Sequence, residues 1–362
     1  MSQNLRFPEF QGEWEKCILG DITENFNLRN KDKIQYPMFS VTNDRGFVPQ
    51  SEQFEGRDMV GEDIKAYKII HTNDFAYNPA RINVGSIAMY TGEKPCMISS
   101  LYVCFKTTKE VNNEWLMQLL KTPKMNYYYN VNGEGGVRVY LFYPNFARIR
   151  MSIPRIEEQK KIAKLLNLID ERIATQNKII DKLQSLIKGI GKQLFMDNQN
   201  WRTVKIGELL RIGNGKDYKH LSIGKIPVYG TGGQMLLVND YLYDGESVCI
   251  GRKGTIDTPM FLKGKFWTVD TLFYTYDFKD VLPKFCYYLF LQINWKLYNE
   301  GTGVPSLSKS TIENIKVKIP SLEQQQKICS ILDCYEHKTN NEEQILELYH
   351  SEKQYLLRQM FI

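Results

Sequence analysis

The chain contains two motifs, and each of them occurs twice. The first is Trp-x-x-x-x-(Ile/Leu)-Gly-(Asp/Glu)-(Ile/Leu), found at Trp14–Ile22 and again 187 residues later at Trp201–Leu209. The second is Ile-Pro-x-(Ile/Leu)-Glu-x-Gln-x-Lys-Ile, found at Ile153–Ile162 and again 166 residues later at Ile319–Ile328. We expect a chain duplicated in this way to fold as two related units, each with its own core.

The two offsets differ by 21 residues, and the difference falls between the first motif and the second. The stretch after the second motif keeps its length, because Lys192–Phe195 matches Arg358–Phe361 at the offset of 166. We therefore predict that helices of fixed length set the geometry and that variable bodies set the identity of each unit. The predicted segments are a first body, a first long helix, a second body and a second long helix, at residues 1–152, 153–196, 197–318 and 319–362.

The stretch after Pro154 has the spacing of a coiled-coil strand. Its apolar residues recur at alternating steps of four and three, with one polar residue among them, which is typical of a helix paired with another helix. These positions, called the seam, are Ile162, Leu166, Ile169, Ile173, Gln176, Ile180, Leu183, Ile187, Ile190 and Leu194. A helix over this span is about 50 Å long at 1.5 Å per residue.

The second copy has a less apolar seam, whose leucines are Leu332, Leu346 and Leu356. Such a helix is a poor strand for a homodimer, but it can serve as partner to the first helix. We predict an intramolecular antiparallel pair, because a long helix without a partner would leave its apolar stripe exposed. The alternative is two ordinary amphipathic helices, each packed on its own body.

Both bodies, at residues 14–150 and 201–318, are predicted to be α+β with many short strands. The strand signals are Tyr36–Val41, Val248–Gly251 and Thr268–Thr275, separated by Gly, Asn and Asp turns.

Basic residues lie beside glycine turns in both bodies. Arg81–Ile87 resembles Gly251–Ile256, and a glycine loop occurs near the end of each body, at Gly133–Arg138 and Gly301–Ser306. Cations on such turns can approach DNA phosphates, and arginine can read guanine edges. The alternative is a hairpin turn with solvated charges. The candidate DNA contacts are Asn78, Arg81, Arg138, Lys216, Tyr218, Arg252 and Lys253.

The composition permits a nucleic-acid partner without requiring one. The net charge is +6, which can neutralise phosphates if the cations gather on one face. No apolar run of about eighteen residues and no signal-peptide core is present, so we expect a cytoplasmic protein without a membrane span. Seven scattered cysteines and four histidines without ligand spacing predict free thiols and no metal site.

No catalytic motif is identifiable. Asn78–Arg81 resembles the Asn-Pro-Pro-aromatic loop of amino-group methyltransferases, but it lacks the second proline and the aromatic residue. Neither a Gly-x-x-x-x-Gly-Lys-(Ser/Thr) loop nor a Gly-x-Ser-x-Gly elbow is present. Carboxylate-x-Lys triplets occur at Asp63–Lys65 and Asp277–Lys279, but such triplets are common by chance. The sequence indicates a protein that recognises rather than reacts, with no catalytic residue.

The two motifs, together with Gly251–Ile256 and Trp267–Phe273, resemble the specificity (S) subunit of type I restriction–modification systems over nearly the whole chain. The resemblance implies two similar target-recognition domains, each followed by a long helix, with the helices paired as an antiparallel coiled coil of pseudo-twofold symmetry. It also implies that each domain reads one half of a bipartite site on double-stranded DNA. The less apolar second seam departs from this pattern.

The resemblance further implies partners that supply the chemistry. Two methyltransferase (M) subunits bind around the helices and methylate adenine, and restriction (R) subunits with ATP-driven translocation join them. S-adenosylmethionine, ATP and Mg are therefore expected on partner subunits and not on this chain. Half-sites one helical turn apart, roughly 34–36 Å, lie on one face of DNA. A helical spacer of about 50 Å has the right order of length for that separation.

Two other functions remain open on the residues alone. A stand-alone sequence-specific DNA-binding regulator would bind DNA tightly by itself and would leave no apolar stripe for partners. A protein–protein recognition scaffold would show no salt-dependent DNA binding.

Overall fold

The computed structural model divides into two compact units. Unit 1 consists of Met1–Gln176 together with Ile345–Ile362, and unit 2 consists of Asn177–Gln344. Each unit therefore holds one body and a part of both long helices. The residues whose structure is described are 5–53, 64–135, 139–196 and 198–361.

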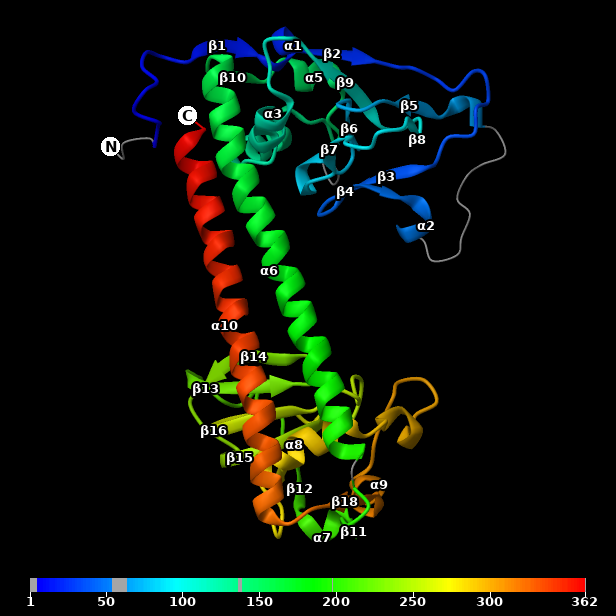
Figure 1. The fold of residues 1–362 in the computed structure, drawn as a ribbon, viewed down its shortest axis with the longest axis vertical. Coiled ribbons are helices and arrows are strands. Elements are labelled where there is room, and N and C mark those ends of the chain that lie inside the picture. Colours follow the sequence, from blue (N-terminus) through cyan, green and yellow to red (C-terminus); the bar gives the residue numbers. More distant parts are fainter. Residues whose placement is uncertain (1–4, 54–63, 136–138, 197, 362) are drawn as a thin grey trace. The chain divides into compact units, whose positions relative to one another are not determined.

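Unit 1 is built on a four-stranded antiparallel sheet (Figure 1). In spatial order its strands are β2 (Thr23–Phe26), β9 (Val103–Thr107), β6 (Phe75–Tyr77) and β7 (Ile87–Met89). Shorter antiparallel pairs accompany it: β1 (Glu15–Ile18) with β10 (Arg150–Ile153), β3 (Phe39–Thr42) with β4 (Gly46–Pro49), and β5 (Lys68–Ile70) with β8 (Cys96–Ile98). The helical segments of this body are α1 (Leu19–Ile22), α2 (Gln50–Gln53), η1 (Ile64–Ala66), η2 (Ile82–Val84), α3 (Asn113–Leu120), α4 (Pro123–Asn132) and α5 (Tyr143–Ala147).

Unit 2 is built on a six-stranded sheet. In spatial order its strands are β12 (Arg211–Asn214), β17 (Leu272–Tyr276), β15 (Tyr243–Gly251), β16 (Met260–Thr268), β13 (Ile223–Gly230) and β14 (Gly233–Val238). Strand β11 (Arg202–Lys205) pairs with β18 (Lys316–Ile319) beside this sheet. The helical segments of this body are α7 (Ile206–Leu209), α8 (Pro283–Gln292), η3 (Trp295–Tyr298) and α9 (Lys309–Asn314).

The two bodies share one topology. The run β2-β9-β6-β7 of unit 1 corresponds to β12-β17-β15-β16 of unit 2. The flanking strand pairs also correspond, because Glu15 lies opposite Ile153 as Arg202 lies opposite Ile319. Unit 2 extends its sheet with β13 and β14, whereas unit 1 carries the pairs β3-β4 and β5-β8. The prediction of two similar α+β domains is therefore confirmed.

The first motif forms a strand-to-helix turn whose glycine allows close packing. A Cβ atom on Gly20 would lie 3.1 Å from the Cβ of Ala147, and one on Gly207 would lie 3.0 Å from the Cβ of Glu313. Both distances are shorter than ordinary van der Waals contact. Only glycine lets α1 approach α5, and α7 approach α9, without displacing a neighbour.

The glutamine of the second motif joins the first long helix, α6 (Ile156–Met196), to the body of unit 1. Gln159 is 1% exposed. Its Oε1 accepts a hydrogen bond from the backbone N–H of Asn112 at 2.8 Å. Its Nε2 donates to the carbonyl oxygens of Glu110 at 3.1 Å and Pro154 at 2.8 Å. The side chain thereby satisfies backbone groups that burial would otherwise leave without partners.

Gln325 does the same in unit 2 at the start of the second long helix, α10 (Leu322–Met360). It is fully buried. Its Oε1 accepts from the backbone N–H of Leu282 at 2.9 Å, and its Nε2 donates to the carbonyls of Asp280 and Pro320 at 3.0 and 3.1 Å. The glutamine of the motif therefore anchors the start of each long helix to the segment that precedes α3 or α8.

The helices α6 and α10 are antiparallel in each unit. In unit 1 the beginning of α6 shares a core with the end of α10, through Ile162, Leu166, Ile169, Leu356, Leu357 and Met360. In unit 2 the end of α6 shares a core with the beginning of α10, through Phe195, Ile328, Cys329 and Leu332. The predicted antiparallel pair is thus confirmed, and the two helices lie side by side in Figure 1.

The seam positions lie on the covered face of each helix. None of the ten seam residues of α6 is exposed, and Leu332 and Leu356 of α10 are buried while Leu346 is half-buried. Four large apolar residues of α6 outside the seam are exposed by 38% or more, namely Leu168, Ile179, Leu186 and Met196. The spacing of four and three therefore separates covered from uncovered apolar residues.

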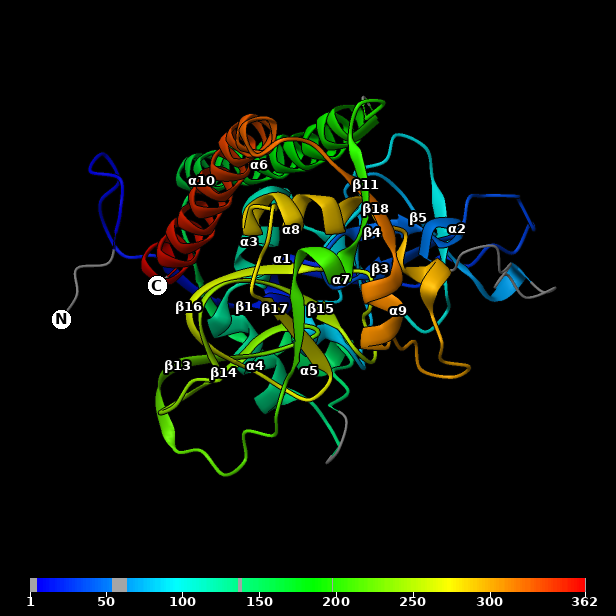
Figure 2. The ribbon, with the colours of Figure 1, turned by 90° about the horizontal axis from the view of Figure 1, so that it is seen from below.

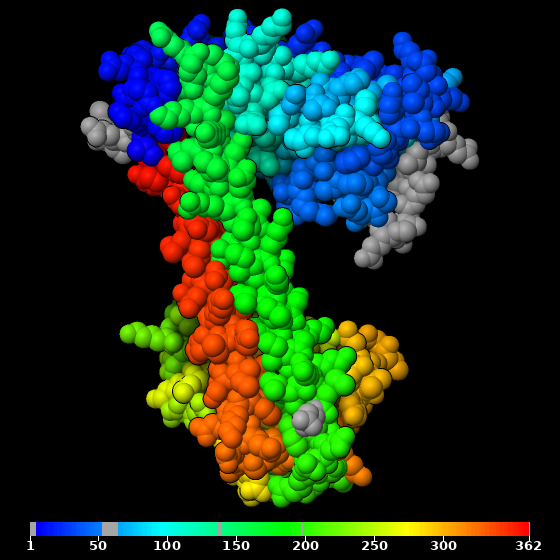
Figure 3. Space-filling model, in the orientation of Figure 1, coloured from blue at the N-terminus to red at the C-terminus, as the bar shows by residue number. Residues whose placement is uncertain are grey.

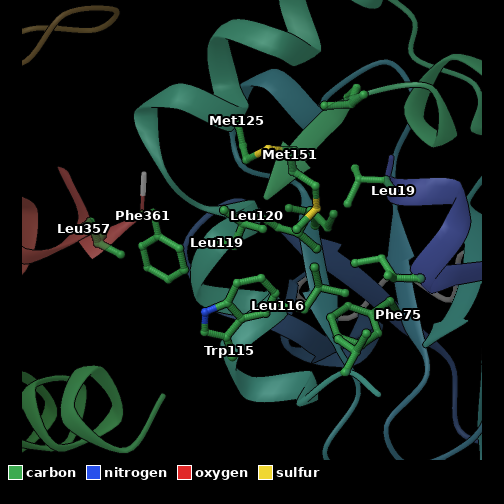
Figure 4. Packing of buried hydrophobic residues seen from close by; sticks show 14 of the residues in the cluster. Leu19, Phe75, Trp115, Leu116, Leu119, Leu120, Met125, Met151, Leu357 and Phe361 are labelled. Carbon is green, nitrogen blue, oxygen red and sulfur yellow. The ribbon is translucent and has the colours of Figure 1, made fainter. Parts of the chain in front are cut away.

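A phenylalanine near the end of each helix packs on an aromatic residue of the body. In unit 1 Phe361 lies 5.9 Å from Trp115 of α3, beside Leu357 (Figure 4). In unit 2 Phe195 stacks at 5.3 Å on Phe285 of α8, which lies between the helices and the sheet (Figure 2). Aromatic pairs at these distances add to the burial of their surface.

One strand prediction is wrong. The stretch Thr268–Thr275 is not a single strand, because β16 ends at Thr268 and β17 begins at Leu272. The backbone N–H of Leu272 donates to the carbonyl of Val269 at 2.9 Å and closes a turn. The β-branched residues around Asp270 indicate a strand by composition, but aspartate is typical of turns.

The buried glutamines generate a first prediction. Gln159→Ala and Gln325→Ala should each lower the free energy of unfolding of their unit by about 1–3 kcal/mol, since each leaves buried backbone groups unsatisfied. Urea denaturation followed by circular dichroism measures the loss. The neighbouring exposed positions supply controls, because Lys160→Ala and Gln324→Ala should have little effect. An equal loss in the control variants would contradict this role.

Two adjacent isoleucines test the seam. Ile180 is 7% exposed and Ile179 is 38% exposed. Ile180→Asp should cost roughly 3 kcal/mol or more, because it buries a charge without a partner. Ile179→Asp places the same charge in water and should cost much less. If thermal unfolding shows equal losses for both variants, the seam is assigned to the wrong face.

Candidate nucleic-acid interface

Three loops of unit 2 meet at the start of β17, namely those that follow β15, precede α9 and follow β12. Backbone hydrogen bonds hold them together. The N–H of Arg252 donates to the carbonyl of Thr271 at 2.7 Å, and the N–H of Leu307 donates to the carbonyl of Arg252 at 2.9 Å. On the third loop, the N–H of Gly215 donates to the carbonyl of Leu272 at 3.2 Å. Arg252 therefore sits at a junction fixed on two sides by the main chain.

The loops line a pocket of about 390 Å³, called the turn pocket. Its lining residues are Asn214, Arg252, Lys253, Phe273, Ser306, Leu307, Ser308 and Lys309. Three of these side chains are cationic, two carry hydroxyls and one carries an amide. Arg252 and Lys253 are exposed. Within the described residues, the one hydrogen bond of these two side chains is the long 3.5 Å contact of Arg252 Nη1 with the carbonyl of Asp270. These cations are thus accessible to an anion from solvent.

Glycines shape the turn that carries Arg252 and Lys253. Gly254 has φ +91°, in the left-handed region that other residues rarely adopt. A Cβ on Gly251 would lie 2.0 Å from the carbonyl oxygen of Thr255, so no side chain fits there. The turn therefore depends on both glycines, which present the two cations between them at the end of β15.

The loop at the other side of the pocket is tied down by Glu300. Its backbone N–H donates to the carbonyl of Ser306 at 2.9 Å. Its carboxylate accepts hydrogen bonds from the hydroxyls of Thr311 and Ser308, which hold the pKa of Glu300 below its usual range. A carboxylate that stays ionised keeps these bonds, and the glycine loop Gly301–Ser306 is held against α9.

Unit 1 builds its corresponding loop in the same way. The backbone groups of Glu134 and Tyr140 exchange hydrogen bonds of 2.8 Å, and the amide of Asn145 donates to the Glu134 carboxylate at 2.8 Å. These residues precede Glu300, Ser306 and Thr311 by 166 positions. Beside the loop, the exposed rings of Tyr140 and Phe142 stack at 6.3 Å. Exposed stacked rings of this kind are a surface on which a nucleobase can stack.

Strand register identifies the counterpart of Arg252 in unit 1. Cys104 of β9 lies between Phe26 and Ala76, as Phe273 of β17 lies between Asn214 and Ile250. Counting two residues onward from Ala76 and Ile250 pairs Asn78 with Arg252. Arg81 lies three residues further on in the turn.

The candidate residues of unit 1 differ in what their side chains do. The Oδ1 of Asn78 accepts from the backbone N–H of Ala80 at 3.0 Å and so shapes the turn. Arg81 is exposed at the start of η2, which ends at Gly85 with φ +99°. Arg138 lies outside the described residues. Arg81 is thus the cation that the described part of this turn offers to solvent.

The candidates Lys216 and Tyr218 of unit 2 do not line the turn pocket. Lys216 is exposed, and its carbonyl accepts from the Nε1 of Trp267 at 2.8 Å. Tyr218 is half-buried against a small cluster that includes Val228 and Trp267. Asn214, Ser306, Ser308 and Lys309 line the pocket although sequence reasoning did not select them. The available signal was the position of Asn214 at a strand end and of the other three after the glycine loop.

Comparisons with known proteins agree with this geometry. Residues 11–185 and 198–348 match the family described as the type I restriction modification DNA specificity domain. The chain belongs to this family. Among its relatives, a putative type I restriction enzyme specificity subunit of Methanocaldococcus jannaschii, MjaX, is 24% identical and aligns over 93% of this chain and 91% of that protein.

Other members extend the comparison. The MjaVIII specificity subunit of the same organism is also 24% identical, over 94% of this chain and 90% of its own length. The crystal structure of a type I restriction–modification S subunit from M. genitalium has a TM-score of 0.64, covering 100% of this chain and 99% of that one. At 15% identity this likeness shows a shared fold. Within the described residues of the chain, no helix is long and apolar enough to cross a membrane.

The turn pocket generates a prediction for DNA binding. Arg252→Ala should weaken specific binding by about 1–3 kcal/mol and relax preference at one position if Arg252 reads a base. A phosphate contact instead predicts an equal loss on all sequences and a shallower salt dependence. Lys263→Ala is the charge-matched control, because Lys263 is exposed and lies outside the pocket. Fluorescence anisotropy at several salt concentrations separates the cases, and binding equal to that of the control would leave the turn a structural element.

Proposed function

We propose that this chain is the sequence-specific DNA-recognition subunit of a type I restriction–modification complex, and that each body reads one half of a bipartite site. The observation that carries the proposal is the repetition of one architecture, with the same loop beyond the same strands in both units. In unit 2 the turn after β15 and the loop before α9 line a pocket with three cations. In unit 1 the turn after β6 carries Arg81, and the loop before α5 carries the Tyr140–Phe142 stack. Cations position phosphates, and side chains at the same turns can reach base edges.

The helices support a second part of the proposal, the docking of two methyltransferase subunits. Although the seam is covered, both helices keep exposed apolar residues, namely Leu168, Ile179, Leu186 and Met196 on α6 and Leu322, Ile331, Ile345, Leu348 and Tyr355 on α10. Exposed apolar residues gathered on one pair of elements are typical of surfaces that bind other proteins. A stand-alone regulator has no use for them, so this observation favours a subunit of a larger complex.

The chemistry is proposed to reside on the partners. The methyltransferase subunits bind S-adenosylmethionine and methylate adenine, and restriction subunits, of which there would be two, bring ATP and Mg. The specificity chain supplies position and sequence choice and has no catalytic residue of its own. The complex acts on double-stranded DNA in the cytoplasm.

A chimera tests the modular reading. Replacing residues 14–150 with the matching body of a relative should change one half of the methylated sequence and leave the other half and the spacing intact. The reason is that distant sites without shared contacts contribute nearly additively. Long-read mapping of methylated adenines in cells gives the result, and replacing residues 201–318 serves as the reciprocal experiment. A chimera that changes both half-sites would mean that the bodies read DNA as one surface.

A further inference from the structure

An N-terminal segment of unit 1, residues 5–13, is called the arm. Its Arg6 forms a fork on Glu158 of α6, with Nε and Nη2 each 2.7 Å from a carboxylate oxygen. Trp14 donates to the same carboxylate at 3.3 Å. The Glu158 side chain is 2% exposed. A carboxylate buried to this degree depends on its partners, so the arm and the first turn of α6 are strongly coupled.

The arm also reaches the end of α10. The backbone N–H of Leu5 donates to the carbonyl of Gln359 at 3.1 Å. Phe7 packs on the core of unit 1, and the Nζ of Lys161 lies 4.5 Å from the centre of its ring. The same Lys161 forms an ion pair with Glu9. The arm thus crosses from the start of α6 to the end of α10, and Figure 3 shows it in dark blue beside both helices.

Unit 2 presents the same surface without an arm. At the offsets of the duplication, Trp14 corresponds to Trp201, Glu158 to Gln324, Lys161 to Lys327, Leu165 to Ile331 and Gln359 to Gln193. All five of these unit 2 residues line a groove of about 580 Å³, together with Ile190, Leu194, Ile328 and Tyr335. Ile331 in this groove is 41% exposed. Glu158, Lys161 and Gln359 contact the arm in unit 1. Their counterparts in unit 2 line an open groove instead.

We infer that the arm is an internal occupant of a docking groove that both units possess, and that the open groove of unit 2 takes a segment of the methyltransferase subunit. This inference rests on the proposed function. The arm makes the two methyltransferase sites unequal. The groove of unit 2 is open and binds first, whereas the groove of unit 1 becomes available only after the arm leaves it.

The arm itself indicates the chemistry of the occupant. Lys161 contacts the aromatic ring of Phe7 and the carboxylate of Glu9. Lys327 is its counterpart in unit 2 and lines the groove together with Ile328 and Ile331. Among the residues that the structure describes, Lys327 pairs with Glu323 alone, and the two side chains are 70% and 78% exposed. Such surface pairs contribute little and are readily exchanged. The groove of unit 2 therefore fits a segment that carries an aromatic or aliphatic anchor next to an acidic residue.

One of the five paired positions differs in charge between the two grooves. Glu158 attracts Arg6, whereas the corresponding Gln324 is uncharged and exposed. An occupant of the unit 2 groove needs no arginine. In unit 1 the apparent affinity for a partner is the intrinsic affinity multiplied by the fraction of molecules whose arm has left the groove.

The test titrates the full-length chain with its cognate methyltransferase subunit, by calorimetry and native mass spectrometry. Two unequal binding steps are expected. The double variant Arg6→Ala, Phe7→Ala and the single variant Glu158→Gln, which gives unit 1 the residue found in unit 2, should each strengthen the second step by about tenfold or more. Gln11→Ala, at an exposed position of the arm, is the control and should leave both steps unchanged.

The groove of unit 2 is tested by Ile331→Lys, which should weaken the first step by about tenfold or more. Leu297→Lys changes an exposed leucine outside the groove and should have no effect. The inference would be overturned if the arm variants left both steps unchanged, or if Ile331→Lys left the first step unchanged. Either result would leave the proposed function standing. If the unaltered chain bound DNA but no methyltransferase, the proposed function would fail and the inference with it.

Discussion

A buried glutamine at the first turn of each long helix is the contact on which the arrangement of each unit depends. Its amide has a carbonyl oxygen and two N–H groups, and Gln159 and Gln325 use them on backbone atoms from two different segments. If the helix shifted relative to the body, these hydrogen bonds would break. The start of the helix and the segment before α3 or α8 therefore move together, and the rest of the body is assembled around that junction.

The fold could be predicted from the sequence wherever the signal is local or repeated. The seam could be assigned because its spacing repeats over many turns, and the duplication could be assigned because whole motifs recur. The role of Gln159 could not be predicted, because its partners Glu110 and Asn112 are more than forty residues away and are backbone atoms. Residue type carries no information about such contacts. The turn at Asp270 was missed for a related reason, since composition alone favoured one strand.

The candidate site shows where sequence reasoning reaches its limit. Glycine turns with adjacent cations were recognisable, and Arg252 and Lys253 do share a pocket. Asn214 joins that pocket because β12, β17 and β15 are neighbours in the sheet. Lys309 joins it because the loop before α9 is hydrogen-bonded to Arg252. In unit 1 the polar residue Asn78 uses its side chain to form its own turn, whereas Arg81 leaves its side chain in water. Both are polar residues in one turn, and only the hydrogen bonds tell them apart.

A duplicated chain gives two equivalent junctions, but the two are made by different means. In unit 2 the end of α6 continues through the chain into Trp201, so a covalent link joins the helix end to the opening tryptophan. In unit 1 the end of α10 meets Trp14 through the arm, by the hydrogen bond of Leu5 to Gln359 and the fork of Arg6 on Glu158. A non-covalent junction can open, whereas a covalent one cannot. The change from Glu158 in one copy to Gln324 in the other adds to this difference, because only the carboxylate can form the salt bridge that holds the arm.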